Sequence, residues 1–69
     1  MPLTLAKPGV ENIIKKVGGN NNIKQFLNSL GITIGGNIKV VAENNGNIIV
    51  KVKDSRIAIS REMANKIII

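Results

Sequence analysis

The aliphatic residues of this chain occur only in short runs, and this pattern restricts the fold more than any other feature. No apolar run is longer than three residues, and glycines or polar residues separate the runs. The apolar residues are dominated by thirteen Ile and six Val, whereas one Phe is the only aromatic residue. β-Branched side chains favour strands, and Gly and Asn favour the tight turns between them. The pattern predicts a mostly β fold of short strands with an aliphatic core.

Length and composition exclude several classes of protein. A chain of 69 residues suffices for one small domain, and we expect residues 1–69 to form it. Because Cys and His are absent, disulfides, thiolate chemistry and an ordinary zinc site are excluded. The apolar runs fall far short of the ~20 residues that span a bilayer, and the N-terminus lacks a signal-peptide pattern. We therefore expect a cytoplasmic protein without direct membrane insertion and without a cofactor.

One segment in the first half of the chain has helical periodicity. The apolar residues spaced i, i+3, i+4 and i+7 are Ile23, Phe26, Leu27 and Leu30. This spacing places them on one face of a short helix, which we expect to pack against the core. Asn22 is the expected N-cap, with Gln25 three residues later as in a capping box. Gly31 suits the left-handed residue at the helix end, and Ile32 the hydrophobic contact that follows it.

Strands separated by turns are expected before and after this helix along the chain. Alternating or continuous aliphatic residues predict strands over 3–5, 10–17, 37–43, 47–53, 56–59 and 67–69. Asp54 and Ser55 are expected to form a turn, and Ser60 is expected to cap a short turn over 61–64. A barrel removes the exposed edges of so few strands. We therefore expect a mostly β fold, a small barrel of five to six short strands with one short α-helix.

The hairpin that joins the two central strands allows two registers. A two-residue turn at Asn45–Gly46 pairs Val40 with Lys51 and mixes apolar and charged residues on both faces. A three-residue loop that includes Asn44 pairs Val40 with Val50 and separates the two kinds of residue. The apolar face then consists of Ile38, Val40, Ala42, Ile48, Val50 and Val52. Since a one-residue slip moves every side chain to the other face, we expect the three-residue loop.

The order of several motifs resembles one protein family over nearly the whole chain. A Pro8–Gly9 turn precedes a strand that ends in Gly18–Gly19, and a Leu-Gly-Ile helix end precedes Gly35–Gly36 and the hairpin. The positions that carry the resemblance are Leu3, Pro8, Gly9, Ile14, Gly19, Leu27, Leu30, Gly31, Ile32, Gly35, Ile38, Val40, Ile57, Ala58, Ile59, Ala64 and Ile67. This pattern is similar to that of the FeoA family, small cytoplasmic accessory proteins of bacterial ferrous iron uptake. The resemblance implies an SH3-like barrel over residues 1–69.

The same resemblance implies a role and a partner. Members of the family work with FeoB, a membrane iron permease with a cytoplasmic GTPase domain, and support or regulate it. We therefore expect a non-enzymatic protein of iron ion homeostasis, held at the inner face of the membrane by its partner. Transition metal binding is implied only at the level of the family. Ferrous iron sites usually combine His with carboxylates, and this chain has isolated carboxylates alone, so we expect no stoichiometric iron site.

Other functions are weaker interpretations of the residues. The four carboxylates are scattered over separate segments, which argues against an acid–base pair. Gly18–Gly19 lacks the Gly-Lys-Ser/Thr of a phosphate-binding loop. A small nucleic-acid-binding barrel is the main alternative, because the net charge is +6 and Lys39, Lys51 and Lys53 are expected on one outer face. Single-strand binders, however, stack bases on aromatic side chains, and Phe26 is expected in the core. We therefore expect no specific nucleic acid partner.

The aliphatic residues are too many for one small interior. Some are expected to remain exposed beside lysines, as a protein-binding surface requires, unless the N-terminal strand and the helix cover them. The candidate partner contacts are Leu30, Gly31, Ile32, Ile34, Gly35, Lys39, Val41, Ile49 and Lys51. The same surface would serve self-association into a homo-oligomer.

Overall fold

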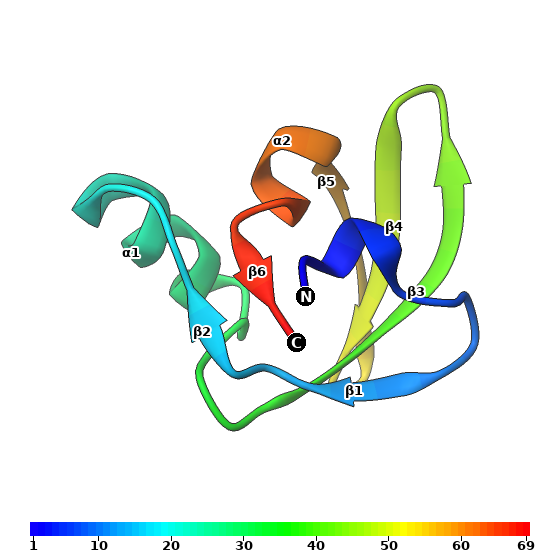
Figure 1. Ribbon diagram of the computed structural model, residues 1–69, viewed down its shortest axis with the longest axis horizontal. Helices are drawn as coiled ribbons and strands as arrows, with labels where there is room; N and C mark the ends of the chain where they lie inside the picture. Colours follow the sequence, from blue (N-terminus) through cyan, green and yellow to red (C-terminus); the bar gives the residue numbers. More distant parts are fainter.

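The chain folds into nine short elements, and the computed structural model describes all of residues 1–69. In chain order they are the 3-10 helix η1 (Leu3–Leu5), β1 (Glu11–Ile13), β2 (Lys16–Val17), α1 (Asn21–Ser29), β3 (Asn37–Asn44), β4 (Asn47–Val52), β5 (Ser55–Ser60), α2 (Arg61–Ala64) and β6 (Ile67–Ile68). Four strands form an antiparallel sheet in the order β1-β3-β4-β5, and β2 pairs with β6 in a second sheet (Figure 1). Neither α-helix is long and apolar enough to cross a membrane.

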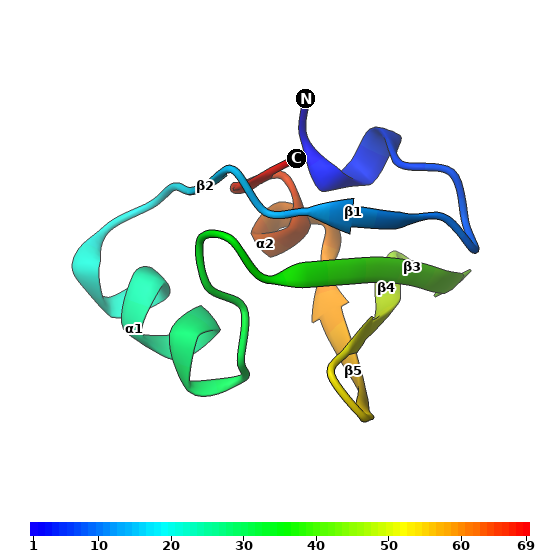
Figure 2. The same ribbon diagram turned by 90° about the horizontal axis from the view of Figure 1, so that it is seen from below.

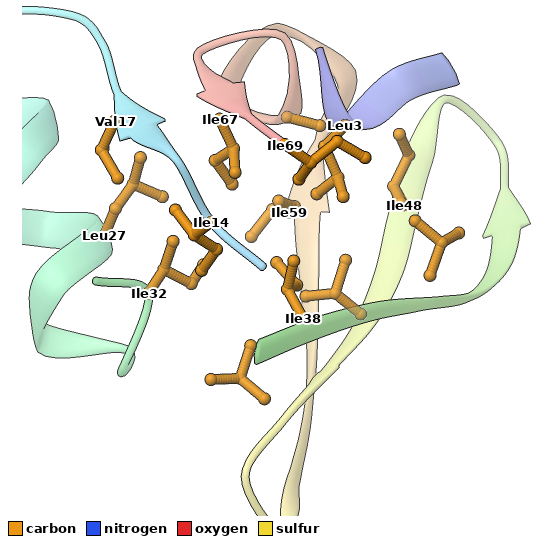
Figure 3. Packing of buried hydrophobic residues seen from close by; sticks show 14 residues of the cluster. Leu3, Ile14, Val17, Leu27, Ile32, Ile38, Ile48, Ile59, Ile67 and Ile69 are labelled. Atoms are coloured by element: carbon orange, nitrogen blue, oxygen red, sulfur yellow. The ribbon is translucent and has the colours of Figure 1, made fainter. Parts of the chain in front are cut away.

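A single aliphatic core fills the space between the two sheets and α1 (Figure 3). Fourteen side chains are buried, and none of them is polar or aromatic. They are Leu3, Ile14, Val17, Leu27, Ile32, Ile38, Val40, Ile48, Val50, Val52, Ile59, Ala64, Ile67 and Ile69. The expectation of a core built from β-branched and other aliphatic side chains is therefore confirmed.

The strand expected over 10–17 is divided between the two sheets, so the prediction of one continuous strand is wrong. β1 pairs with β3, whereas β2 pairs with β6. Between them Ile14 is buried, and its N–H donates to the Gly36 carbonyl at 2.8 Å. The chain changes sheets at this point because Ile14 must enter the core while Ile13, which is 54% exposed, remains on the outer face. Figure 2 shows the bend between β1 and β2.

The N-terminal segment is the 3-10 helix η1 rather than the expected strand. Leu3 is fully buried and Leu5 is 66% exposed, so one turn places a single leucine in the core. The N-terminal ammonium group of Met1 donates to the carbonyl of Ile69 at 2.8 Å. The two termini therefore lie side by side (Figure 1). The expected C-terminal strand is present as β6.

Helix α1 begins two residues earlier than expected. Asn20, not Asn22, is the N-cap, and its side-chain oxygen accepts from the Ile23 N–H at 2.9 Å. Leu27 is fully buried, but Phe26 is 46% exposed, so its expected place in the core is wrong. The reason is that a helix of nine residues against one side of a small barrel buries only a narrow strip centred on Leu27.

The C-terminus of α1 has the structure that its sequence predicts. Gly31 has a φ of +92°, and its N–H donates to the Asn28 carbonyl at 2.9 Å. The Ile32 N–H donates to the Leu27 carbonyl at 3.0 Å. These two hydrogen bonds form a Schellman motif, and Ile32 completes it by packing into the core beside Leu27.

The β3–β4 hairpin closes with a two-residue turn, so the expected three-residue loop is wrong. Glu43 pairs with Ile48, which leaves Asn45 and Gly46 as the turn. Both turn residues have positive φ, 51° and 82°. This conformation is a type I′ turn, for which Asn-Gly is the preferred pair because its twist matches that of the strands. Local turn chemistry therefore outweighed the side-chain pattern at this end of the hairpin.

A β-bulge at Val41 restores the expected pairing further along the hairpin. The register shifts between Val40 and Ala42, and Val40 pairs with Val50 as the apolar pattern predicts. The extra residue of a bulge changes the register by one, which is the correction that the two-residue turn requires. Ala42 lies on the turn side of the bulge and is exposed, so its expected inward position is wrong.

The turn after β4 lies one residue earlier in the chain than predicted, and the cap of the following helix is as predicted. Val52 pairs with Ser55, so the turn residues are Lys53 and Asp54 rather than Asp54 and Ser55. Lys53 has a φ of 56°, an uncommon conformation for a residue with a side chain. Ser60 caps α2 as expected, since its hydroxyl oxygen accepts from the Met63 N–H at 3.1 Å.

Candidate partner-binding surface

The outer face of the four-stranded sheet carries a row of charged residues that crosses all four strands. Glu11 on β1 pairs with Lys39 on β3, Lys39 pairs with Lys51 on β4, and Lys51 pairs with Arg56 on β5. Directly paired residues point to the same face of a sheet, so these four side chains are neighbours. Lys39 and Lys51, which were expected on one outer face, are paired directly, and the neighbouring strands add Glu11 and Arg56 to them.

A hollow of about 330 Å³ lies on this face, and no hydrophobic residue lines it. The five residues that line it, here called the lysine hollow, are Glu11, Asn37, Lys39, Lys51 and Lys53. The prediction that Lys39, Lys51 and Lys53 share one outer face is therefore confirmed.

The lysine hollow has an excess of positive charge that the protein does not neutralise by contact. Three lysines stand against one carboxylate, that of Glu11. The only ion pair in the chain joins Arg61 with Glu43 at the other end of the hairpin. Like charges directly opposite in a sheet are destabilising, so this arrangement costs stability. It favours an anionic or acidic group over this part of the surface.

The same face carries partly exposed aliphatic side chains next to the lysine hollow. Val41 and Ile49 are both half-buried. Ile49 pairs with Ala58 on β5, and Ala58 is exposed. Val41 lies at the bulge, two residues along β3 from Lys39, and Ile49 lies two residues along β4 from Lys51. The structure thus brings four of the sequence candidates together as a mixed aliphatic and cationic surface, which we call the sheet face: Lys39, Val41, Ile49 and Lys51.

The remaining candidates belong to the loop between α1 and β3, and one of them is not available. Ile32 is fully buried because the Schellman motif directs it into the core, so it cannot contact a partner. Ile34 is 69% exposed and is the most exposed large hydrophobic residue of the chain. Gly35 is exposed as well, whereas Leu30 and Gly31 are half-buried. The Gly35 N–H donates to the Ile14 carbonyl at 2.8 Å, which anchors this loop to the bend between β1 and β2.

Sequence reasoning missed several residues of this surface. Glu11 and Arg56 join the lysines through the pairing of β1 with β3 and of β4 with β5. Asn37 lies on β3 two residues before Lys39, so alternation within that strand was an available signal for it. Ile13 was not assigned to either face, and its 54% exposure on β1 adds an aliphatic side chain beside Asn37. Alternation within β1 could have placed Ile13 on the outer face. That inference would have required knowing that residues 10–17 form two strands rather than one.

The structure brings no catalytic or metal-binding set of side chains together. No group of three or more Asp, Glu, Cys or His residues is close enough to hold a metal ion. No polar or charged side chain is buried. The class of protein is thus a small mostly β, SH3-like barrel of six short strands, and its distinctive surface is aliphatic and cationic.

Comparison with known proteins identifies the family. The model of the FeoA domain family matches residues 1–69. A Fe(2+) transport protein A of Methanocaldococcus jannaschii is 44% identical over 68 residues, which are 99% of this chain and 83% of that protein. The chain therefore belongs to the FeoA family, non-enzymatic accessory proteins of ferrous iron transport. The resemblance inferred from the glycine and aliphatic positions is confirmed.

Solved structures confirm the fold class. The crystal structure of an iron uptake regulatory protein (FeoA) superposes with a TM-score of 0.88 at 32% identity and covers 97% of this chain and 91% of that chain. FeoA of Stenotrophomonas maltophilia, an SH3 domain protein complexed with zinc, gives a TM-score of 0.84 at 22% identity over 99% of this chain and 87% of that chain. The mostly β, SH3-like architecture is thus shared, and the second comparison bears on the fold alone.

Proposed function

We propose that residues 1–69 act as one cytoplasmic SH3-like module that supports or regulates ferrous iron uptake by binding the cytoplasmic part of an FeoB-type permease. The observation that carries this proposal is the sheet face, where Val41 and Ile49 lie beside Lys39 and Lys51. A module without catalytic groups acts through contact, and membership of the FeoA family supports the iron uptake system as the place of that contact.

The two parts of the surface have different physical roles. Burial of aliphatic side chains supplies affinity at roughly 25 cal/mol per Å² of apolar area, before the costs of association are subtracted. The lysines mainly accelerate encounter with an acidic partner and select against a basic one, and salt weakens their contribution. The exposed Ile34 in the α1–β3 loop is a second anchoring side chain of the same chemistry.

The test is binding of this protein to the purified cytoplasmic domain of the FeoB-type permease, measured by NMR titration. Val41→Glu and Ile34→Glu are each expected to weaken the complex about tenfold or more, as the loss of an interface anchor does. Leu5→Glu is the matched control, because Leu5 is 66% exposed and lies on η1, away from the α1–β3 loop (Figure 1). Its affinity should equal that of the unmodified protein.

Two other outcomes would contradict the proposal. One is absence of binding to the cytoplasmic domain and to the intact permease, together with tight binding to nucleic acid at physiological salt. The exposed Phe26 offers one stacking side chain for this alternative, but single-strand binders use several. The other is a stable homo-oligomer that buries the sheet face, detected by light scattering; the net charge of +6 on each copy opposes it.

A further inference from the structure

We propose that the lysine hollow is a binding site for a compact, multiply charged oxyanion of the diphosphate type. The site uses Lys39, Lys51 and Lys53 as cationic anchors and the Asn37 amide as a neutral donor. The site shares Lys39 and Lys51 with the sheet face, but its test needs only this chain and a small ligand.

The positions of the three lysines suit a ligand with several oxygen atoms. Lys39 and Lys51 are directly opposite on neighbouring strands, about 5 Å apart at the backbone. Lys53 lies two residues beyond Lys51, about 7 Å along the chain direction. Lys39 is half-buried, which limits the directions its ammonium group can take. Three flexible side chains around one hollow can therefore close on a single anion from three directions.

The charge of the hollow explains why an anion would be favoured there. Glu11 is the only acidic residue in the lining, and it forms no ion pair with the lysines. Lys51 also faces Arg56 on its other side, so it lies between two cationic neighbours. Each like-charge pair disfavours the folded sheet, and an anion bound between Lys39 and Lys51 adds attractions that offset their repulsion. A ligand with two or more negative charges gains more from this site than one with a single charge.

The lining also restricts the kind of ligand. No hydrophobic or aromatic residue contributes to it, and the only aromatic side chain, Phe26, belongs to α1. An organic ring or a nucleobase would find no apolar wall or stacking partner inside the hollow. The observations therefore favour a compact oxyanion over a nucleic acid or a bulky organic acid.

The experiment is an NMR titration of the ¹⁵N-labelled protein with pyrophosphate at low salt, compared with sodium chloride at matched ionic strength. We expect saturable shifts of the amides around the hollow in β1, β3 and β4 with pyrophosphate and none with chloride. Lys51→Gln is expected to weaken affinity about fivefold, the factor that corresponds to one unit charge at 4 Å in water. Because Lys51→Gln also removes two like-charge contacts, it should fold at least as well as the unmodified protein.

Lys24→Gln is the matched control, since it removes the same charge from α1, outside the hollow. Equal weakening by Lys24→Gln and Lys51→Gln would mean that net charge alone attracts the anion, and would overturn the site. Equal shifts with sodium chloride would overturn it as well. Tighter binding of a short poly-glutamate peptide than of pyrophosphate at the same amides would replace the compact oxyanion by an acidic protein segment.

Discussion

Lys51→Glu tests the charged row of the sheet, and the structure gives both its direction and its size. Lys51 has a cationic neighbour on each side, Lys39 on β3 and Arg56 on β5. The substitution replaces two repulsive cross-strand pairs by two attractive ones. If each repulsion and each attraction contributes about 0.3 kcal/mol, the unfolding free energy rises by about 1 kcal/mol. A domain of this size then melts about 4–8 °C higher.

Thermal and urea unfolding at low salt provide the measurement, because guanidinium chloride would screen the charges under test. Lys51→Gln removes the repulsions without adding attractions, so it should give about half the gain. Lys15→Glu changes the net charge by the same amount but lies between β1 and β2, outside the charged row. It should give little of the gain, which separates pairing from net charge.

The salt dependence of the stability gain can refute its explanation by cross-strand charge pairs. At 1 M salt the screening length is about 3 Å, so the difference between the unmodified protein and Lys51→Glu should largely disappear. If the gain persists at 1 M salt, or if Lys15→Glu matches Lys51→Glu, the pairing of Lys51 with Lys39 and Arg56 does not cause it. The same variant is also expected to lose pyrophosphate binding.

Two further predictions concern the helix end and the metal. Gly31→Ala should lower the unfolding free energy by about 1–2 kcal/mol, since φ is +92° and the new Cβ would lie 3.3 Å from Val52 Cγ1. Gly18→Ala, where φ is not positive, should cost less, and equal losses in urea unfolding would contradict the conformational explanation. Anaerobic titration with ferrous iron should reveal no tight site with one ion per chain, because His and Cys are absent. A saturable stoichiometric site would refute this.

The features that the sequence predicted correctly are those with interactions a few residues apart. Gly31 and Ile32 end α1 through hydrogen bonds to Asn28 and Leu27, all within one local motif. Ser60 caps α2 for the same reason. Alternation within β3 and β4 was enough to place Lys39, Val41, Ile49 and Lys51 on one face, so this part of the candidate surface was visible without the tertiary structure.

Several other features depend on how distant segments meet. The division of 10–17 into β1 and β2 follows from their different partners, β3 and β6, and no local pattern distinguishes Ile13 from Ile14. The exposure of Phe26 follows from how little of α1 the barrel can cover. Ile32 cannot make its predicted contact with a partner, because its side chain packs into the core instead of projecting from the loop.

The structure of the β3–β4 hairpin depends both on the local preference of its turn residues and on packing against the core. Asn45–Gly46 determined its own turn, since positive φ at both positions is a local preference of these residues. The apolar pattern determined that Val40 lies opposite Val50, since both must face the core. The turn and the apolar pattern require pairing registers that differ by one residue. The folded sheet accommodates both registers through a bulge at Val41. The lysine hollow likewise exists only after folding, because strand order places Glu11 beside Lys39, which is more than ten residues away along the chain.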